Sequence, residues 1–319
     1  MTTLPHPDRP AALPFDAPAT CALPELGVIR AVGDDAASFL QGQLTQDVAG
    51  LAPGAVRLAG YCSPKGRLLA SFVVRRVAAD EFLMVCSADL LAATLKRLSM
   101  FVLRARCKLT DATATHRCWG IAGPIAWAET AVGAPGAGLA TEGRTLLRLP
   151  DAAGLARVLC VAPPDADAPV AEPLAPAAWA WLEVRAAVPR IVARTADAFV
   201  PQMVNLEVVG GVSFQKGCYP GQEIVARSQY RGTIKRRAMP AVVDASAAPG
   251  DEVFDEADAG QPAGQVVLAA DWPEAAGHAH VALVELKLAS VESGATLRLR
   301  TADGPLLRLE ALPYALPAA

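Results

Sequence analysis

One segment of the 319-residue chain combines a thiol, a cation and two glycines at a spacing that could support chemistry. It reads Phe214-Gln215-Lys216-Gly217-Cys218-Tyr219-Pro220-Gly221-Gln222-Glu223 and continues with helix-forming residues to Arg227. Gly217 and Gly221 would let the backbone turn sharply, and Pro220 suits the first turn of a helix. Cys218 would then lie at or just before a helix N-terminus, with Lys216 two residues away. Both features favour an anion, so the segment predicts a functional thiolate at Cys218, activated by Lys216.

Two other interpretations of Cys218 stay open at this point. A free cysteine is most often a small packing residue, here at a tight turn. The glycine-rich segment could also hold a carboxylate or a phosphate on its backbone N–H groups, with the thiol incidental. The other six cysteines are widely spaced and form no C-x-x-C pair, which argues against a disulfide framework and against a zinc site. The four histidines add no metal pattern, so no metal is expected.

The composition is that of a globular protein. Apolar residues make up 53% and charged residues 19%, which excludes a disordered chain. The formal net charge of −3 argues against broad, non-specific binding of nucleic acid. Apolar runs such as residues 68–74 are too short to cross a bilayer, and the proline-rich start lacks the apolar run of a secretion signal. We therefore expect a cytoplasmic protein with a flexible arm over residues 1–20.

The pattern of apolar residues predicts an α+β protein. A short helix would begin after Asp35 and a longer one after Ser87, with a hairpin of residues 68–77 and 81–86 between them. Residues 104–109 and 199–214 are predicted to be extended, with a helix near residues 179–187. Beyond Arg237 the alternation is all β, which is typical of a small antiparallel barrel or sandwich. This places a core domain at residues 21–236 and a β domain at residues 237–319.

The cysteine segment resembles the signature of the YgfZ family of folate-binding proteins, which are relatives of the aminomethyltransferase (T-protein) of the glycine cleavage system. Further segments are similar to the family in the same order along the chain: Phe39-Leu40-Gln41-Gly42-Gln43-Leu44-Thr45-Gln46-Asp47-Val48, Ser63-Pro64-Lys65-Gly66-Arg67, Phe199-Val200-Pro201-Gln202-Met203-Val204-Asn205-Leu206, Tyr230-Arg231-Gly232 and Leu312-Pro313-Tyr314. The resemblance covers residues 23–316.

The resemblance implies a T-protein-like fold of three subdomains in a ring, two of them interwoven in residues 21–236, with a C-terminal antiparallel β-barrel. It implies a cavity for tetrahydrofolate or a one-carbon derivative, with the cysteine segment at or near it and Trp179 stacked on the ligand. The candidate binding residues are Trp179, Gln43, Asp47, Gly217, Tyr219, Gly221, Gln222, Glu223, Arg227 and Arg231. It also implies an accessory role in iron–sulfur cluster assembly or repair and, through it, in tRNA modification (methylthiolation). The expected partners are then iron–sulfur proteins such as radical tRNA-thiolating enzymes, without direct contact with nucleic acid or membrane.

Two polar groups outside the cysteine segment have an ordinary interpretation beside the functional one. The run from Gln41 to Asp47 would normally be a solvated helix end, and only the resemblance makes Gln43 and Asp47 candidates for the cavity. A basic run follows the cysteine segment and consists of Arg227, Arg231, Lys235, Arg236 and Arg237. We expect it to form a solvated face beside the cavity mouth, where it could attract the glutamate tail of folate.

Two sites depart from the aminomethyltransferases, and one departs from the YgfZ family. Ala70 and Ser71 stand where those enzymes carry an aspartate, and a second folate-contacting tryptophan of the family falls at Leu26. Arg185 stands where a glutamate holds the pterin, and a guanidinium cannot accept the N–H bonds that a pterin edge donates. We therefore expect the protein to bind folate as an accessory factor rather than to catalyse a transfer. A tetrahydrofolate-dependent aminomethyl- or methyltransferase is the alternative, with Glu223 or Asp47 supplying the carboxylate, and a pure interaction scaffold is the third hypothesis.

Overall fold

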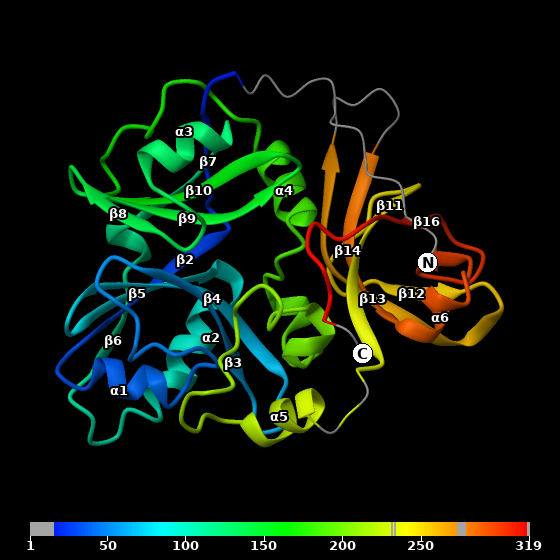
Figure 1. The fold of residues 1–319 in the computed structure, drawn as a ribbon, viewed down its shortest axis with the longest axis horizontal. Helices are drawn as coiled ribbons and strands as arrows, with labels where there is room; N and C mark the ends of the chain where they lie inside the picture. The colour runs from blue at the N-terminus through cyan, green and yellow to red at the C-terminus, as the bar shows by residue number, and fades with distance from the viewer. Residues whose placement is uncertain (1–15, 231, 233, 273–278, 318–319) are drawn as a thin grey trace.

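The computed structural model describes residues 16–230, 232, 234–272 and 279–317, which form three sheet-based units around a common centre (Figure 1). Two five-stranded sheets, A and B, lie on the left of the view, and a closed barrel lies on the right. The predicted α+β class and the C-terminal antiparallel barrel are confirmed. Among the described residues no helix has the length and apolar character needed to span a membrane.

Sheet A is antiparallel and takes its strands from two distant parts of the chain. Its order is β1 (Ala19–Ala22), β7 (Arg117–Gly123), β10 (Leu155–Ala162), β9 (Arg144–Ala152) and β8 (Gly138–Thr141). β1 pairs with β7, with Thr20 opposite Ile121, and therefore begins inside the region that the sequence suggested as an arm. Every residue of β10 is buried, because α3 (Ile125–Ala131) packs on one of its faces and the centre of the molecule covers the other.

Sheet B follows β1 in the chain and is also antiparallel. Its order is β3 (Val56–Cys62), β4 (Leu68–Ala78), β5 (Glu81–Ser87), β2 (Leu26–Val32) and β6 (Lys108–Asp111). The predicted hairpin is confirmed as β4 and β5. The two predicted helices are α1 (Ala36–Gln41) and α2 (Ala88–Ser99), both packed on this sheet. The prediction of an extended start at residue 104 was wrong, because residues 100–106 form turns after α2 and β6 begins only at Lys108.

The helix predicted near residues 179–187 is α4 (Pro176–Arg185), which joins sheet A to the barrel. It packs against β13 and β14 of the barrel, and its buried residues lie all around the helix. The extended structure predicted for residues 199–214 is wrong. Pro201 starts the 3₁₀ helix η3 (Pro201–Val204), which ends at Asn205 with φ +59°, and turns follow. Two further short helices are η1 (Thr113–Thr115) and η2 (Ala193–Thr195), and α5 (Gln222–Tyr230) leads toward the barrel.

The barrel closes in the order β11 (Arg236–Val243), β14 (Ala279–Lys287), β13 (Asp258–Trp272), β12 (Glu252–Asp255), β15 (Leu297–Leu299) and β16 (Leu306–Leu309). It has a hydrophobic core of its own, formed by small aliphatic residues such as Val253, Val284 and Leu299. The prediction that this region is entirely β is wrong in one place, because the short helix α6 (Leu288–Glu292) follows β14.

Candidate functional site

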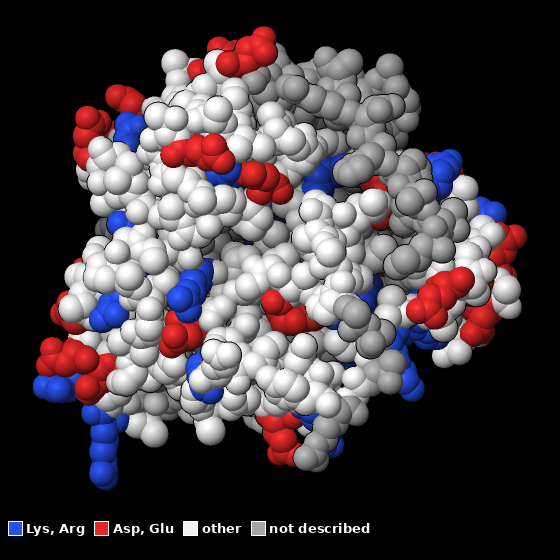
Figure 2. Space-filling view, viewed as in Figure 1, with Lys and Arg blue, Asp and Glu red and all other residues white. Residues whose placement is uncertain are grey.

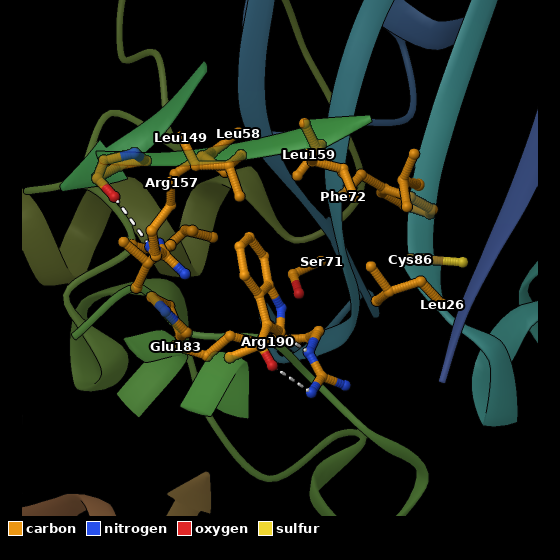
Figure 3. Close-up of a pocket in the computed structure, with 17 residues that line it drawn as sticks. Leu26, Leu58, Ser71, Phe72, Cys86, Leu149, Arg157, Leu159, Glu183 and Arg190 are labelled. Carbon is orange, nitrogen blue, oxygen red and sulfur yellow. Dashed lines mark hydrogen bonds and ion pairs between the residues drawn. The ribbon is translucent and has the colours of Figure 1, made fainter. Parts of the chain in front are cut away.

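A cavity of about 60 Å³ lies where sheet B faces sheet A, with α4 on a third side (Figure 3). Sheet B contributes Leu26, Leu58, Ser71, Phe72, Val85 and Cys86, sheet A contributes Leu149, Arg157 and Leu159, and α4 contributes Trp179 and Glu183. The walls are thus mostly apolar, with a few convergent polar groups, as in many small-molecule sites. Ser71, where the transferases carry an aspartate, and Leu26, where the YgfZ family carries a tryptophan, both belong to this lining.

Trp179 is the aromatic wall of the cavity. The residue is 1% exposed, and its indole Nε1 has no hydrogen-bond acceptor among the described residues. The guanidinium of Arg157 lies 5.7 Å from the centre of the indole ring. A buried donor without an acceptor is costly, so this N–H is available to a polar partner.

The position of Trp179 depends on Gly120 in β7. A Cβ atom at Gly120 would lie 2.5 Å from the indole ring, a contact that real Cβ atoms do not make. We expect Gly120→Val to displace the ring and to lower the free energy of unfolding by about 2 kcal/mol. Urea unfolding measures the change in stability, and the near-ultraviolet circular dichroism of the folded variant reports whether the indole ring of Trp179 has moved. Gly154→Ala is a control for an effect of the backbone alone. Gly154 has φ +76°, and no heavy atom lies within 4 Å of a Cβ at this position. Unchanged stability and unchanged aromatic dichroism in Gly120→Val would contradict this packing.

Figure 3 shows the charged groups of the cavity, with Arg157 of β10 above and the Glu183–Arg190 pair below it. Arg157 is 3% exposed, its Nε donates to the Pro150 carbonyl at 3.0 Å, and burial lowers its pKa to about 10. Its two terminal nitrogens have no acceptor in the described part of the chain. Glu183 binds Arg190 through both carboxylate oxygens, at 3.0 and 2.9 Å. The Ser71 hydroxyl accepts a bond from the Ile191 N–H and keeps its own proton to donate.

Cys218 lies on a loop and is exposed, whereas the other six cysteines are buried. Those six pack in the interior as small hydrophobic residues. The expected place of Cys218 at a helix start is wrong, because α5 begins only at Gln222 and Pro220 also precedes the helix. The helix N-terminus therefore gives no direct support to a thiolate at Cys218, and its accessibility is the property that distinguishes it.

Lys216 ties the cysteine loop to the end of α1. Its Nζ donates to the Leu44 carbonyl at 2.6 Å and to the Gln41 carbonyl, and lies 4.8 Å from the ring centre of Tyr219. Burial lowers the pKa of Lys216 to about 8, with Asp47 and Cys218 opposing the shift. Burial also raises the pKa of the Tyr219 hydroxyl. The ammonium is thus a structural anchor that brings the segment 41–47 together with the cysteine loop.

The glycines of the loop differ from what the sequence suggested. Gly221 has φ +78°, and a Cβ atom there would lie 2.4 Å from the Ser63 carbonyl oxygen and 2.6 Å from Cα of Gly66. The turn of residues 63–67 therefore packs directly on the cysteine loop. Gly217 has neither a positive φ nor a heavy atom near its would-be Cβ. The interpretation of Gly217 as a second obligatory turn glycine was wrong.

The other candidate binding residues lie away from the cavity. Gln43 has a buried Oε1 without a hydrogen-bond donor among the described residues. Asp47 accepts bonds from Gln41 Nε2 and the Gly50 N–H. Gln222 begins α5, and Glu223, exposed on that helix, pairs with Arg227 at 2.9 Å. Arg231 lies outside the described residues. Of the predicted binding residues that the structure describes, Trp179 alone lines the cavity, and the cysteine loop lies outside its lining.

The basic run does not form one solvated face. Arg237 is 5% exposed and pairs with the buried Glu207, and Arg236 binds Glu285 through both carboxylate oxygens. Figure 2 shows acidic and basic side chains interspersed over the face in view. The predicted basic face is therefore wrong for Arg236, which pairs within the barrel between β11 and β14, and for Arg237, which joins the barrel to the segment before it.

Arg185, at the position of the transferase glutamate, does not line the cavity. It forms a buried ion pair with Glu310, and its guanidinium lies 5.1 Å from the ring centre of Trp181. Burial lowers its pKa to about 10. The residue holds the C-terminal segment against α4. The cavity residues that sequence reasoning missed are Arg157, Glu183 and Arg190, and a single arginine in the otherwise apolar run of β10 was the available signal for the first.

Comparison with known proteins identifies the family to which the chain belongs. The GCVT N-terminal domain family matches residues 19–130. The tRNA-modifying protein YgfZ of Vibrio vulnificus (strain YJ016) is 34% identical over 227 residues, which cover 68% of this chain and 68% of that protein. The chain belongs to the YgfZ family. Another YgfZ protein, from Klebsiella pneumoniae (strain 342), is 29% identical over 331 residues and covers 99% of both chains.

The architecture of this YgfZ family member is shared with a solved aminomethyltransferase. The glycine cleavage system aminomethyltransferase T from Bartonella henselae superposes with a TM-score of 0.72 at 17% identity, covering 93% of this chain and 86% of that one. At this identity the likeness concerns the fold. It confirms the T-protein-like architecture that the sequence resemblance implied.

Proposed function

We propose that the protein is a tetrahydrofolate-binding accessory factor that supports iron–sulfur cluster assembly or repair and, through it, tRNA methylthiolation. The observation that supports the ligand is Trp179, whose indole lines the cavity between sheets A and B while its N–H has no acceptor within the described part of the chain. An aromatic wall suits a flat conjugated ligand, because ring stacking adds about 1 kcal/mol beyond the area buried. The fold shared with an aminomethyltransferase supports a folate among such ligands.

The residue types that line the cavity suit a folate ring system, and the walls would have to separate to admit it, because about 60 Å³ is far below the roughly 300–1,000 Å³ of ordinary ligand pockets. Its apolar walls could enclose the rings, and the free donors of Arg157 and Trp179 could meet ring nitrogens or a carbonyl. Glu183, held in place by Arg190, offers remaining lone pairs to an amino group. A bound tetrahydrofolate would supply a one-carbon carrier, and the role of these residues is to orient it and exclude water.

We assign the second part of the function to Cys218. Its thiol is exposed, and the loop that carries it is fixed by Lys216 and by the packing of Gly221 on residues 63–67. An exposed thiol on a fixed loop can reach a partner protein, which the buried cysteines cannot. The partners we propose are iron–sulfur proteins such as radical tRNA-thiolating enzymes, in keeping with the tRNA-modifying name of the relatives.

The aminomethyltransferase alternative needs a carboxylate at the reacting nitrogen. Asp47 and Glu223, the two candidates from the sequence, do not line the cavity, and the charge of Glu183 is neutralised by Arg190, which makes its carboxylate a weaker base. This arrangement favours binding over turnover. Turnover of an aminomethyl donor with tetrahydrofolate, abolished in Glu183→Gln, would instead favour the transferase.

Titration with tetrahydrofolate tests the ligand. We expect saturable quenching of tryptophan fluorescence in the native protein and in Trp181→Phe, whose indole lies on α4 outside the cavity lining. Trp179→Phe should lose this quenching and, by calorimetry, bind about tenfold more weakly, because a phenyl ring gives less stacking area. Calorimetry is needed because the variant also removes the fluorescent reporter. Equal affinity of the native protein and Trp179→Phe would contradict the placement, and no binding up to about 1 mM would reject the proposal.

A further inference from the structure

The segment of residues 96–108 combines exposed apolar side chains with an excess of basic ones. It contains the end of α2, the turns of residues 100–106 and the first residue of β6. Met100, Phe101 and Leu103 are 57%, 42% and 86% exposed, and they are three of the six large hydrophobic side chains exposed among the described residues. Apolar side chains gathered at one place on a surface indicate a contact with a partner, whereas scattered ones do not.

Leu103 is unfavourable for the folded chain at its own position. Its backbone has φ +45°, in the left-handed region that a side chain makes costly. Because the side chain is almost fully exposed, no packing within the chain offsets this cost. Glycine or asparagine would adopt the same conformation more easily. A strained and exposed leucine therefore indicates a role in binding rather than in folding.

The charge of this segment has a single sign. Its charged residues are Lys96, Arg97, Arg104, Arg106 and Lys108, and it contains no acidic residue, although the whole chain has a net charge of −3. Of these five, Arg106 alone forms ion pairs within the described part of the chain, with Asp34 at 2.8 Å and Asp35 at 3.5 Å. The surface around the apolar side chains therefore attracts an acidic partner and repels a second copy of itself.

The segment is held in one conformation at its base. The Asp35 N–H donates to the Arg106 carbonyl at 3.1 Å, and the Asp35 carboxylate accepts a bond from the Arg106 N–H at 2.8 Å. Gly33 lies directly against the same carbonyl, because a Cβ atom there would overlap the oxygen. The guanidinium of Arg97 lies 6.0 Å from the ring centre of Phe101. A surface fixed before binding loses little conformational entropy when a partner docks.

This segment and the cysteine loop lie at opposite ends of α1. Gly33 and Asp35, which contact Arg106, precede the helix, and Lys216 of the cysteine loop binds carbonyl groups at its other end. A helix of six residues is about 9 Å long, whereas a standard protein interface covers about 800 Å² on each partner. A protein that docks on residues 96–108 can therefore extend along α1 to the exposed Cys218.

We propose that residues 96–108 form the docking surface for an acidic iron–sulfur protein on which Cys218 acts. The inference rests on the proposed function and adds to it the surface that selects the partner. Leu103 enters an apolar pocket of the partner, and the cations around it meet Asp and Glu side chains on the rim of that pocket. A pocket of fixed shape rewards a leucine held in one position. An RNA would instead contact mainly the cations, and a lipid surface would accept any apolar side chain.

Calorimetric titration with a purified radical tRNA-methylthiolating enzyme, its iron–sulfur clusters intact, tests the apolar part of the surface. We expect Leu103→Asn to bind at least about tenfold more weakly than the native protein, because the variant removes the anchor of the contact. Its midpoint of urea unfolding should be unchanged or higher, since asparagine tolerates the left-handed backbone. Leu139→Asn is the matched control, at a leucine that is 41% exposed on β8 of sheet A. It should keep the native affinity.

The same titration with the double variant Lys96→Gln, Arg104→Gln tests the charges. Both side chains are exposed and form no ion pair among the residues that the structure describes. We expect several-fold weaker binding at low salt. The native protein should lose more affinity than the double variant between about 50 and 300 mM salt, because salt screens the attraction between exposed charges.

The outcomes separate this surface from the proposed function. Native affinity in both Leu103→Asn and the double variant would overturn the docking surface and leave the partner and the folate ligand in place. No binding of the enzyme to the native protein would reject both the surface and the proposed partner. Binding of the native protein to tRNA or to phosphatidylglycerol vesicles, lost in Leu103→Asn, would assign the segment to a nucleic acid or a lipid and overturn the proposal. A large loss of stability in Leu103→Asn would give the leucine a structural role and also overturn it.

Discussion

Replacing Gly221 by valine should lower the free energy of unfolding by about 3 kcal/mol or more, enough to prevent accumulation of folded protein in many cases. Two costs add at this position. The residue has φ +78°, which a β-branched side chain does not tolerate. Its Cβ would also meet backbone atoms of Ser63 and Gly66, which cannot move aside as a flexible side chain could.

Gly217→Val is the matched control, four residues away on the same loop. Nothing lies within 4 Å of a Cβ at Gly217 and its φ is not positive, so we expect a change of about 0.5 kcal/mol or less. Thermal and urea unfolding of the two variants check the contrast. Equal midpoints for Gly217→Val and Gly221→Val would show that the turn of residues 63–67 does not pack on the cysteine loop as described.

Alkylation of the folded protein at pH 8 should modify Cys218 and leave the other six thiols intact. Burial raises the pKa of five buried thiols to between about 11 and about 12, namely Cys21, Cys62, Cys86, Cys118 and Cys160, and raises that of Cys107. A thiol with a pKa near 12 has only about 1 in 10⁴ molecules as thiolate at pH 8, and the thiolate is the nucleophile. Steric burial slows the reagent further.

Intact-mass analysis with iodoacetamide measures this directly. We expect one adduct on the native protein and on Cys107→Ser, and none on Cys218→Ser in the same time. Peptide mapping should place the single adduct at Cys218. Several adducts before unfolding, or an adduct that persists in Cys218→Ser, would contradict the burial of the other cysteines. The same Cys218→Ser variant tests the function, because an interaction scaffold without thiol chemistry would keep its activity in cells.

Local patterns predicted the elements whose own residues determine them. The apolar runs of β4 and β5 and the apolar faces of α1 and α2 depend on neighbours in sequence, and these elements were predicted correctly. The prediction for residues 199–214 was wrong because their apolar composition suggested a strand. In the structure Pro201 begins a 3₁₀ helix and Asn205 ends it in a left-handed conformation. The predicted start of α5 was a few residues too early, because Pro220 suits a first helical turn but here lies in a turn before the helix.

The candidate site was only partly predictable because its partners are distant in sequence. Trp179 was predicted to hold the ligand and does line the cavity, although its contact with a ligand stays a prediction. The buried partner of Arg185 is Glu310, at the far end of the chain, and no spacing rule connects them. The pairing of Lys216 with the carbonyl groups at the end of α1 is a similar case. Such pairs are set by tertiary packing, which periodicity does not encode.

The route of the chain through its two sheets has a consequence for folding. The chain lays down β1, builds all of sheet B, and only then makes β7, the strand with which β1 pairs. Pairings over such long sequence separations form slowly, because the entropy of closing the loop is lost before the contacts are gained. The cavity between sheets A and B is complete only after β9, β10 and α4 have folded onto sheet B. A ligand that binds in this cavity therefore recognises only the fully folded form. We expect the supply of that ligand to set how much of the newly made chain escapes proteolysis, since binding to the native state alone shifts the folding equilibrium toward it.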